Sequence, residues 1–453
     1  MLLEFIDREA ELKILEERYK SKTAEFIVIY GRRRVGKTEL IKHFIEEKIH
    51  FYFLAKKKKM EEERERFGIK FSEKFNVFLK DTKDWDSLFN KMCENEKEKL
   101  VIVIDEFPFW IEKDKSILSD FQHAWDELLV KKNVVLILCG SYVSVMENEV
   151  LGYQSPLYGR RTAQIELNKL NFNEFKLFFP KWKIEEIINA YGALDGIPFY
   201  IKEFAQENNF FENICNTFWK KGSVLNKEVE FLLSQELREV ETYLSIMRSI
   251  YEGATKLGEI ASKSRVEITN INKYLKTLID LKFVSTESPV IINRPKQKNH
   301  IYKITDNFFS FWLSYVHPFR DEIEIGEMEY LKEFFQKDYS SYLGNIFENI
   351  CREKLKEISP IKITKIGRWW YQDKEIDIVA LNEEKKEILF AECKWANLNY
   401  SEARKIIDEL KEKSKFVNWE RKKEHFCIMA KKLKEKQKLI KEGILAFDLE
   451  DFE

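Results

Sequence analysis

Eight consecutive residues, from Gly31 to Thr38, have the types and spacing of a loop that holds the phosphates of a nucleotide. Gly31 and Gly36 let backbone N–H groups turn toward phosphate oxygens, because no Cβ stands in the way. The Lys37 ammonium group can reach the β- and γ-phosphates, and the Thr38 hydroxyl can ligate Mg²⁺. We therefore expect ATP to bind through the whole loop: Gly31, Arg32, Arg33, Arg34, Val35, Gly36, Lys37 and Thr38.

A second motif consists of two acids at the end of an apolar run. The run Leu100–Ile104 is typical of a buried strand and is followed by Asp105 and Glu106. In open α/β sheets, ligands bind at the carboxyl ends of the strands. We expect Asp105 to hold Mg²⁺ opposite Thr38, and Glu106 to orient or deprotonate the attacking water. The alternative is a strand that ends in solvated acids, and the accompanying phosphate loop makes it the weaker interpretation.

Three further polar residues follow or precede strands of the same region. Ser141 comes just after the run Val134–Cys139 and is either a sensor of the γ-phosphate or an ordinary turn residue. Arg160 and Arg161 stand just before the last predicted strand. An arginine can stabilise the charge of the transition state, in cis or from a neighbouring subunit of a homo-oligomer. Surface arginines are common, so both alternatives stay open for this pair.

The elements that position these residues alternate as in a parallel α/β sheet. Residues 1–167 alternate apolar runs with helical patterns, which indicates βαβ units and a nucleotide-binding core. Helical patterns with short breaks follow over residues 168–238. Five apolar runs predict the strands of the core: Phe26–Tyr30, His50–Leu54, Leu100–Asp105, Val134–Cys139 and Ala163–Leu167.

Several ordered motifs in residues 1–235 resemble the predominantly archaeal ATPase family of STAND/AAA-like P-loop ATPases. The motifs are Phe5–Leu12, Gly31–Thr38, Asp105–Glu106, Cys139–Ser141, Leu157–Arg161 and Gly196–Tyr200. The resemblance implies ATP hydrolysis and a helical lid. It also implies a five-stranded parallel core whose catalytic strand lies between the loop strand and its outer neighbour. In related ATPases the proline of a Gly-x-Pro turn in the lid approaches the adenine, and here that residue is Pro198. Taken alone, Gly-Ile-Pro predicts only a helix-breaking turn.

Residues 239–320 have the pattern of a winged helix. Leu257–Ala261 and Ile268–Phe283 predict a helix, a turn and a second helix with Thr269 as its N-cap. A hairpin is expected over Val284–Ile304. Three residues of the second helix would face a major groove: Asn272, Lys273 and Lys276. Four basic residues of the hairpin loop would contact phosphates: Arg294, Lys296, Lys298 and His300. The alternative is a regulatory module that packs on the nucleotide domain without binding DNA.

Residues 328–453 carry a second set of groups suited to phosphate chemistry. Glu392 and Lys394 are two residues apart on a predicted strand, so both side chains lie on the same face. If Asp377 lies on the neighbouring strand, two carboxylates and an amine converge. Such a set can bind Mg²⁺, activate water and stabilise charge that develops on a phosphodiester.

This arrangement resembles the PD-(D/E)xK nuclease superfamily over roughly residues 330–453. The resemblance implies a small α/β domain in which Asp377 and Glu392 ligate Mg²⁺ or Mn²⁺. It also implies that Lys394 positions the water or stabilises the anion and that Glu348, on the preceding helix, is an additional acid. Ile376 stands where the name of the family has proline. The alternative is a strand face of salt-bridged acids and lysines. Trp369, Trp370 and Tyr371 are expected to pack the sheet rather than stack on bases.

The bulk composition leaves these hypotheses open. The chain has 453 residues and a formal net charge of −1, but residues 394–442 carry 15 Lys/Arg against 8 Asp/Glu. That local excess permits a polyanionic partner without requiring one. Six cysteines without C-x-x-C spacing predict neither a disulfide framework nor a zinc site, which suits a reducing cytoplasm. No apolar run approaches the ~20 residues that span a bilayer. We therefore expect a cytoplasmic protein without a transmembrane segment.

Two separate phosphate-chemistry sites in one chain lead to a combined hypothesis. We expect an α/β ATPase, with a lid and a winged helix, whose nucleotide cycle gates a metal-dependent, nuclease-like domain that acts on nucleic acid, with DNA favoured. The alternatives are an ATP-driven switch or a DNA-binding regulator with an inactive tail, and an ATPase that remodels proteins.

Overall fold

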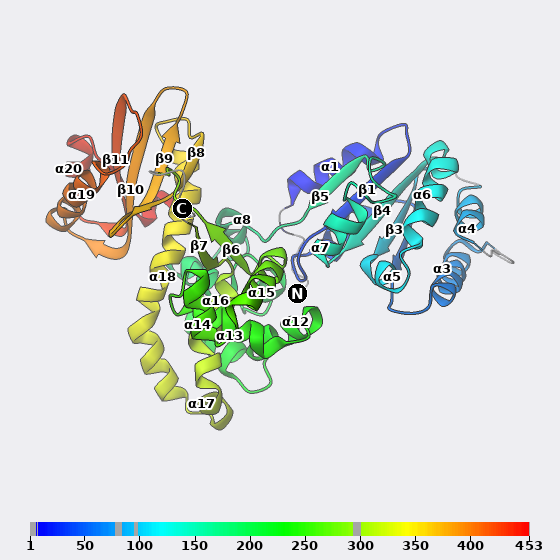
Figure 1. Ribbon diagram of the computed structural model, residues 1–453, viewed down its shortest axis with the longest axis horizontal. Helices are drawn as coiled ribbons and strands as arrows, with labels where there is room; N and C mark the ends of the chain where they lie inside the picture. The colour runs from blue at the N-terminus through cyan, green and yellow to red at the C-terminus, as the bar shows by residue number, and fades with distance from the viewer. Residues whose placement is uncertain (1–5, 7, 78–83, 95–97, 293–299, 453) are drawn as a thin grey trace. The chain divides into compact units, whose positions relative to one another are not determined.

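The computed structural model describes residues 6, 8–77, 84–94, 98–292 and 300–452. Backbone contacts divide the chain into two compact units. The first unit contains the residues up to 170 together with residues 197–202, and the second contains residues 171–196 and 203–453. The first unit is mainly the blue and cyan part of the ribbon (Figure 1).

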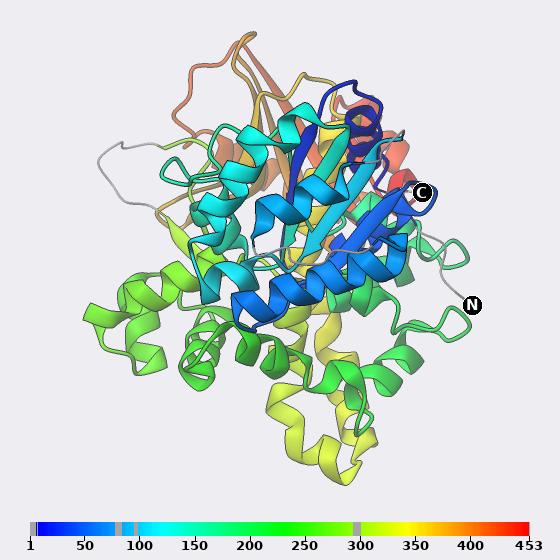
Figure 2. The same cartoon turned by 90° about the vertical axis from the view of Figure 1, so that its right-hand side faces the viewer.

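The first unit is built on a parallel sheet of five strands in the order β2-β3-β4-β1-β5. Figure 2 looks onto this unit, with helices in front of the strands. The strands are β1 (Glu25–Tyr30), β2 (His50–Leu54), β3 (Leu100–Asp105), β4 (Val134–Gly140) and β5 (Ala163–Glu166). Every residue of β1, β3 and β4 is buried, as expected of strands covered on both faces. The predicted α/β class and five-stranded core are confirmed.

The prediction that the catalytic strand lies beside the loop strand is wrong. β1, which leads into the phosphate loop, pairs with β4 and β5, whereas β3 pairs with β2 and β4. The acid-bearing strand is therefore separated from the loop strand by β4 rather than lying beside it. Because β1, β3 and β4 are all unbroken apolar runs, the sequence contains nothing that ranks their order within the sheet.

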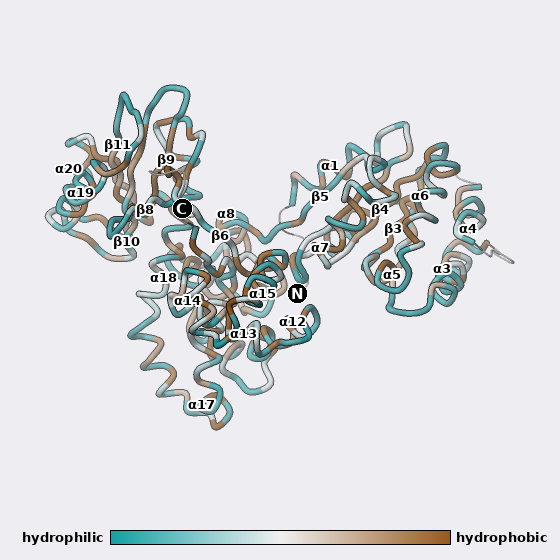
Figure 3. The backbone as a smooth tube through the Cα atoms, viewed as in Figure 1, coloured by the Kyte–Doolittle hydropathy of each residue, from teal (hydrophilic) through white to brown (hydrophobic). Residues whose placement is uncertain are grey.

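Helices surround this sheet. They are α1 (Glu9–Tyr19), α2 (Lys37–Ile45), α3 (Met60–Phe75), α4 (Trp85–Met92), α5 (Pro108–Lys113), α6 (Ile117–Glu127) and α7 (Val143–Val145). Phe51, Phe67, Trp85 and Trp110 lie in one core cluster of this unit, and their rings approach one another edge to face or tilted. Figure 3 shows the hydrophobic stretches of β3 and β4 in brown. This core supports the strand ends that carry the polar residues.

The helical region after β5 is divided between the two units. Its helices are α8 (Phe172–Lys176), α9 (Ile184–Leu194), α10 (Pro198–Ile201), α11 (Phe210–Ile214) and α12 (Glu228–Glu236). Residues 197–202, which contain α10, belong to the first unit, and the helices on either side belong to the second. The short turn that holds Pro198 is therefore packed with the nucleotide-binding core.

The next segment contains α13 (Val240–Tyr251), α14 (Leu257–Ser264), α15 (Ile268–Asp280) and an antiparallel pair, β6 (Val284–Glu287) and β7 (Ile301–Ile304). The order helix, turn, helix, hairpin is the one that the sequence predicts. The predicted N-cap is wrong, because α15 begins after Glu267 and Thr269 lies inside the first turn. Arg294, Lys296 and Lys298 lie outside the described residues. α16 (Asn307–Tyr315) and α17 (Arg320–Ile325) follow.

The chain ends in a second, mixed sheet preceded by a long helix, α18 (Met328–Ile358). The sheet has the order β12-β11-β10-β9-β8, in which β8, β9 and β10 are antiparallel and β10, β11 and β12 are parallel. Its strands are β8 (Lys365–Tyr371), β9 (Lys374–Asn382), β10 (Glu387–Leu398), β11 (Lys423–Leu433) and β12 (Leu445–Phe447), with α19 (Tyr400–Ser414) and α20 (Lys436–Lys441) between them.

One strand of this sheet is misplaced by the sequence prediction. The run Ile361–Ile366 predicts a strand, but β8 spans Lys365–Tyr371. Ile361 is nevertheless buried, so the run packs without entering the ladder until its end. Trp369 is fully buried among core residues such as Ile376, and Tyr371 packs at the edge of the same cluster, in agreement with the packing interpretation. Throughout the described part of the chain, no helix is both long and apolar enough to cross a membrane.

Candidate active sites

The phosphate loop connects β1 to α2 through a tight path that requires glycine at both ends. Gly31 has φ +154°, and a Cβ at this position would lie 2.2 Å from the carbonyl oxygen of Leu167. Gly36 has φ +96° and is the N-cap of α2. Between them, Arg34 also has a positive φ, of 71°. Positive-φ residues alternate with ordinary ones along this loop, and such turns can direct backbone N–H groups toward one concave side, which favours an anion.

Lys37 and Thr38, the first two residues of α2, are already engaged at this loop. Lys37 is buried, and its Nζ donates hydrogen bonds to the carbonyl oxygens of Gly31 (2.7 Å) and Arg32 (2.8 Å). Burial lowers the pKa of the Lys37 ammonium group. Thr38 Oγ1 donates a 2.8 Å hydrogen bond to Asp105 Oδ2, so the two predicted Mg²⁺ ligands lie together across the sheet edge.

The predicted base and sensor also lie together. Ser141 Oγ donates to Glu106 Oε2 (2.7 Å) and Oε1 (2.9 Å). Glu106 itself has φ 57°, which is strained for a residue with a side chain. Its N–H donates a 2.9 Å hydrogen bond to Asp105 Oδ1. Because strained residues concentrate at functional sites, this backbone geometry supports a functional role for Glu106.

The two arginines before β5 have different surroundings. Arg160 is bonded to Asp126 through Nε (2.8 Å) and Nη2 (2.7 Å) and to the carbonyl oxygen of Pro156 through Nη1 (2.8 Å). Its guanidinium group is therefore occupied within its own unit. Arg161 is within electrostatic reach of the Tyr30 hydroxyl at the end of β1.

Side chains from residues 197–202 and from the strand ends complete the surroundings of the loop. The Arg34 guanidinium lies 3.9 Å from the ring centroid of Phe199, and the Arg33 guanidinium lies 4.9 Å from that of Tyr142. A Cβ at Gly36 would lie 3.8 Å from Pro198 Cγ. Pro198 thus lies at the end of the phosphate loop; its approach to the adenine, which the family resemblance implies, stays a prediction.

Two residues of this site were not predicted. Tyr52, on β2, donates a 2.5 Å hydrogen bond to Asp105 Oδ2, the same oxygen that Thr38 contacts. Burial and the nearby carboxylate raise the pKa of Tyr52. Arg8 donates from Nη2 to the carbonyl oxygens of Val35 (3.3 Å) and Asn168 (2.6 Å) and so ties the phosphate loop to the end of β5. Both contacts join distant parts of the sequence: Arg8 lies in the Phe5–Leu12 motif, which does not indicate its partners, and no local pattern marks Tyr52.

The second site lies where β9 and β10 pair. Ala391 of β10 is opposite Ile378 of β9, so Asp377 and Glu392 are on adjacent strands, as the sequence hypothesis requires. The ladder between β8 and β9 shifts register at this point: Gly367 pairs with Val379 and Trp369 pairs with Ile376. Two residues of β9, Asp377 and Ile378, therefore stand opposite the single residue Arg368. Such bulges re-aim side chains and are frequent next to active sites.

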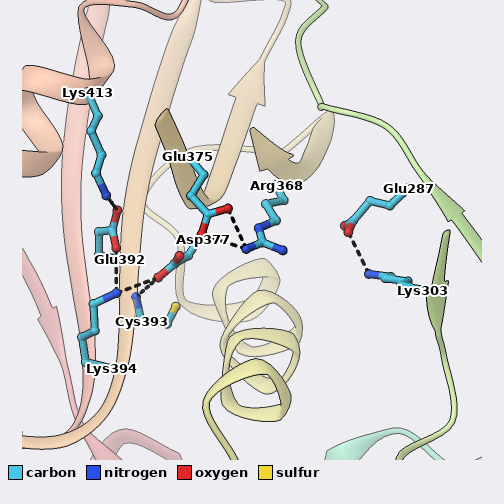
Figure 4. Close-up of polar contacts among 9 residues, drawn as sticks. All are labelled: Glu287, Lys303, Arg368, Glu375, Asp377, Glu392, Cys393, Lys394 and Lys413. Carbon is cyan, nitrogen blue, oxygen red and sulfur yellow. Dashed lines mark hydrogen bonds and ion pairs between the residues drawn. The ribbon is translucent and has the colours of Figure 1, made fainter. Parts of the chain in front are cut away.

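Lys394 bridges the two carboxylates (Figure 4). Its Nζ lies 2.9 Å from Glu392 Oε2 and 3.3 Å from Asp377 Oδ2. Burial alone would lower the pKa of Lys394, but the charges of Asp377 and Glu392 outweigh it and raise that pKa. Asp377 also accepts a 2.9 Å hydrogen bond from the N–H of Cys393. Both carboxylates are almost completely buried, which makes their contacts with cations necessary.

Lys413, on the last turn of α19, is a member of this site that the sequence did not reveal. Its Nζ donates a 2.8 Å hydrogen bond to Glu392 Oε1, so that Glu392 is held between two ammonium groups. Burial and the charge of Asp377 nevertheless raise the pKa of Glu392. Glu348, on α18, belongs to the same electrostatic group: burial, reinforced by Asp377, raises its pKa to about 7.

The acids do not form a ready-made metal cage. Among the described residues, no three His, Cys, Asp or Glu side chains are arranged so that they could hold a metal ion as they stand. The donor chemistry nevertheless fits a hard cation, because Asp377 and Glu392 aim oxygens at one point. That point is the Lys394 ammonium group, so a divalent cation would have to displace it.

The hairpin before α16 contacts the edge of this sheet. The Val290 N–H donates a 2.9 Å hydrogen bond to the carbonyl oxygen of Arg368, and Val290 and Ile291 lie in the core cluster of the second sheet. Glu287 of β6 pairs with Lys303 of β7 (3.0 Å) and with Arg352 of α18 (3.5 Å). Figure 4 shows this hairpin pair beside Arg368. The hairpin is therefore packed beside the second site.

Comparison with known proteins identifies two regions. Residues 5–204 match the family model of an ATPase domain predominantly from Archaea, and residues 312–406 match a family of archaeal and bacterial proteins of unknown function. An uncharacterized protein of Methanocaldococcus jannaschii is 38% identical over 454 residues, which cover 99% of this chain and 100% of that protein. An uncharacterized ATP-binding protein of the same organism is 52% identical over 44 residues, or 10% of this chain and 75% of that protein.

Among solved structures, the Walker-type ATPase of Pyrococcus abyssi is similar in fold. It aligns with a TM-score of 0.52 and 22% sequence identity over 68% of this chain and 96% of its own. At this identity the likeness concerns the fold alone.

Proposed function

This chain belongs to the family of ATPases found predominantly in Archaea, and from that premise we propose that its ATP hydrolysis gates a metal-dependent nuclease-like site acting on DNA. The ATPase activity follows from the family. The nuclease activity, its metal and the gating are the proposal. The observation that carries it is the convergence of Asp377, Glu392 and Lys394 at a buried point of the second sheet.

At the first site, the residues around the loop divide the work of hydrolysis. Thr38 and Asp105 would hold Mg²⁺, which neutralises phosphate charge when it is bound. Lys37 exchanges its contacts with the loop carbonyls for the β- and γ-phosphates. Glu106, released from the Ser141 hydroxyl, accepts the proton of the attacking water. Arg161 is the arginine that we propose to stabilise the transition state, in cis or from a second copy, because Arg160 is bonded to Asp126.

At the second site, Asp377 and Glu392, with Glu348 as an additional acid, would hold Mg²⁺ or Mn²⁺, which activates water and offsets charge on the phosphodiester. Lys394 moves off the two carboxylates and donates to the developing anion. Lys413 stays on Glu392 and fixes its orientation. Glu348 loses its proton when the cation binds, since a carboxylate must be charged to act as a ligand.

A chain of contacts supports coupling between the sites. Pro198 and Phe199 lie at the phosphate loop in the first unit, and α9, which directly precedes their turn, is bonded to α18 in the second. Tyr339 and Tyr342 of α18 donate hydrogen bonds to the carbonyl oxygens of Asn189 (2.6 Å) and Gly192 (2.8 Å) of α9. Glu348 lies less than two turns farther along α18. A shift of the lid turn on nucleotide hydrolysis would therefore move α9 and, through it, the helix that carries Glu348.

DNA is the proposed substrate because of two exposed lysines on α15 and of a positively charged stretch late in the sequence. Lys273 and Lys276 are exposed on α15, in the position of a recognition helix of a winged helix. Residues 394–442 contain the end of β10, all of α19, β11 and α20, and carry 15 Lys/Arg against 8 Asp/Glu. Positive charge on one side of a domain favours a polyanion.

The test of the nuclease is the cleavage of end-labelled single- and double-stranded DNA with Mg²⁺ or Mn²⁺. We expect wild type to cleave and Asp377→Asn to lose cleavage while it retains ATP hydrolysis. Asp373→Asn is the matched control, because Asp373 is 80% exposed and pairs only with Lys374 at 3.5 Å among the described residues. Cleavage that survives Asp377→Asn, or that Asp373→Asn also removes, contradicts the assignment.

A second candidate is an ATP-driven switch whose tail binds DNA without cutting it. The bridging of both acids by Lys394, with no three-ligand metal group among the described residues, favours this alternative. It predicts DNA binding by wild type and Asp377→Asn alike, with cleavage by neither.

A further inference from the structure

Arg368 is a cation at the second site that the proposed chemistry does not use. It lies on β8 opposite the bulge that contains Asp377, and Figure 4 shows its side chain beside that residue. Its Nη2 donates to both carboxylate oxygens of Glu375, at 2.9 Å each. Its Nε is buried and has no hydrogen-bond partner among the residues that the structure describes. The guanidinium fork is therefore only partly used.

The two members of the Arg368–Glu375 pair differ in exposure. The side chain of Arg368 is 23% exposed and that of Glu375 is 54% exposed. An ion pair with one partner largely in solvent contributes little to stability, so the Glu375 carboxylate can leave the guanidinium group at small cost. The Arg368 side chain cannot move into solvent as easily as the Glu375 side chain can. Its backbone is fixed on the outer side, where Val290 donates to its carbonyl oxygen and packs against Gly367.

We propose that Arg368 is the phosphate-binding residue of this site and that Glu375 occupies its fork in the absence of substrate. A phosphodiester of the bound strand replaces the Glu375 carboxylate and accepts two parallel N–H hydrogen bonds, the geometry that guanidinium offers and ammonium does not. This inference rests on the proposed function, since it assigns the substrate a nucleic-acid backbone. Arg368 positions that backbone beside Asp377, whereas Lys394 serves the reacting group.

The direction in which two substitutions change the Kd for DNA distinguishes a phosphate-binding role of Arg368 from a purely structural one. Arg368→Gln should raise the Kd of a labelled oligonucleotide duplex about tenfold or more, and its KM in cleavage equally, with kcat little changed. Glu375→Gln should lower the Kd, because it removes the competitor. Arg368→Lys should recover only part of the affinity. If the pair merely holds the sheet together, both Gln variants should weaken binding and lower the melting temperature.

The experiment uses the full chain and measures binding by fluorescence anisotropy without divalent metal, followed by cleavage with Mg²⁺. Lys362→Ala is the control, because Lys362 is an exposed lysine of the same segment that pairs with Glu384 at 3.3 Å. Equal affinity of Arg368→Gln and wild type overturns the inference, even if wild type cleaves DNA. Binding that depends on Arg368 without cleavage upholds the inference and removes only the nuclease activity. Wild type that binds no duplex at low salt overturns both.

Discussion

The Tyr342 hydroxyl group donates a 2.8 Å hydrogen bond to the carbonyl oxygen of Gly192, and this bond joins α18 to the last turn of α9. The same hydroxyl lies 3.0 Å from the carbonyl oxygen of Asn307, at the start of α16. One tyrosine hydroxyl thus connects α9, the long helix α18 that carries Glu348, and α16, the helix that follows the hairpin. Such a junction can pass on a displacement because a packed contact is not continuously deformable.

Gly192→Ala should disturb this junction. A Cβ at Gly192 would lie 2.8 Å from Leu343 Cδ2 and 3.0 Å from Tyr339 Oη, and both side chains are buried. Overpacking costs about 1–3 kcal/mol, and alanine regains about 1 kcal/mol of helix propensity. We therefore expect the free energy of unfolding in urea to fall by up to about 2 kcal/mol.

Gly344→Ala is the matched control for this substitution. Gly344 lies in α18, one residue after Leu343, and a Cβ there would meet no atom within 4 Å. This variant should be up to about 1 kcal/mol more stable than wild type. Equal effects of the two substitutions would show that the close contact at Gly192 does not matter.

Glu106→Gln should retain ATP binding and lose most of the hydrolysis. The amide keeps the size of the side chain but cannot accept a proton from water. Loss of a general base lowers kcat by about 10²–10⁴-fold. Phosphate release measures kcat, and fluorescent-nucleotide titration measures Kd. Glu149→Gln, at a half-buried glutamate that pairs with Lys115, should change neither quantity. A normal kcat in the Glu106→Gln variant would show that a group other than Glu106 is the general base.

Stability should fall as pH rises through neutrality because of Glu348. Burial raises the pKa of Glu348 from the ordinary 4.5 to about 7, so the folded chain binds this proton more tightly than the unfolded chain does. The stabilisation is complete below the unfolded pKa and is lost as pH approaches the folded pKa. Urea unfolding should give about 1–3 kcal/mol less stability at pH 8 than at pH 5 from this group.

Glu348→Gln should remove that part of the pH dependence, because glutamine stays neutral. Glu333→Gln, at an exposed position of the same helix, should leave the dependence unchanged. A Glu348→Gln profile parallel to that of wild type would mean that Glu348 is already charged at neutral pH.

Replacing Lys273 and Lys276 by alanine should weaken duplex binding and its salt dependence together. Each phosphate contact contributes about 0.9 to the slope of log Kobs against log salt, so the double variant should have a slope smaller by about 2. Titrations at several salt concentrations give the slope. Lys263→Ala is the control, since Lys263 lies on α14 and is paired with Glu252 at 3.0 Å. An unaltered slope in the double variant would show that Lys273 and Lys276 of α15 do not contact DNA phosphates.

The first site could be predicted well from the sequence because its chemistry is encoded locally. β2 and β3 have the predicted bounds, and β3 is an apolar run between Lys99 and Glu106. Thr38 and Asp105 meet as predicted, because both follow from motifs at strand ends. The order of the strands could not be predicted, because sheet neighbours are chosen by tertiary packing. Tyr52 escaped detection for the same reason, since its contact with Asp105 spans 53 positions.

For the second site, the sequence predicted the two carboxylates and Lys394 but not Lys413 or the role of Arg368. Period-two spacing places Glu392 and Lys394 on one face, and the strand pairing brings Asp377 beside them. Lys413 reaches Glu392 from α19, and the role of Arg368 depends on a register shift between β8 and β9. Neither a helix docking angle nor a β-bulge leaves a reliable trace in residue spacing. Residues such as Lys413 and Arg368 can be assigned to the site only from the three-dimensional structure.

The gating claim is tested most directly by the rate at which the full chain cleaves labelled DNA with Mg²⁺ under four nucleotide conditions: none, ATP, ADP and a non-hydrolysable ATP analogue. Coupling between sites typically changes an equilibrium about 5–150-fold, so we expect wild-type rates with ATP and ADP to differ by at least about fivefold. Lys37→Ala should cleave at one rate in all four conditions. Equal wild-type rates in all four, from a preparation that hydrolyses ATP, would contradict the claim.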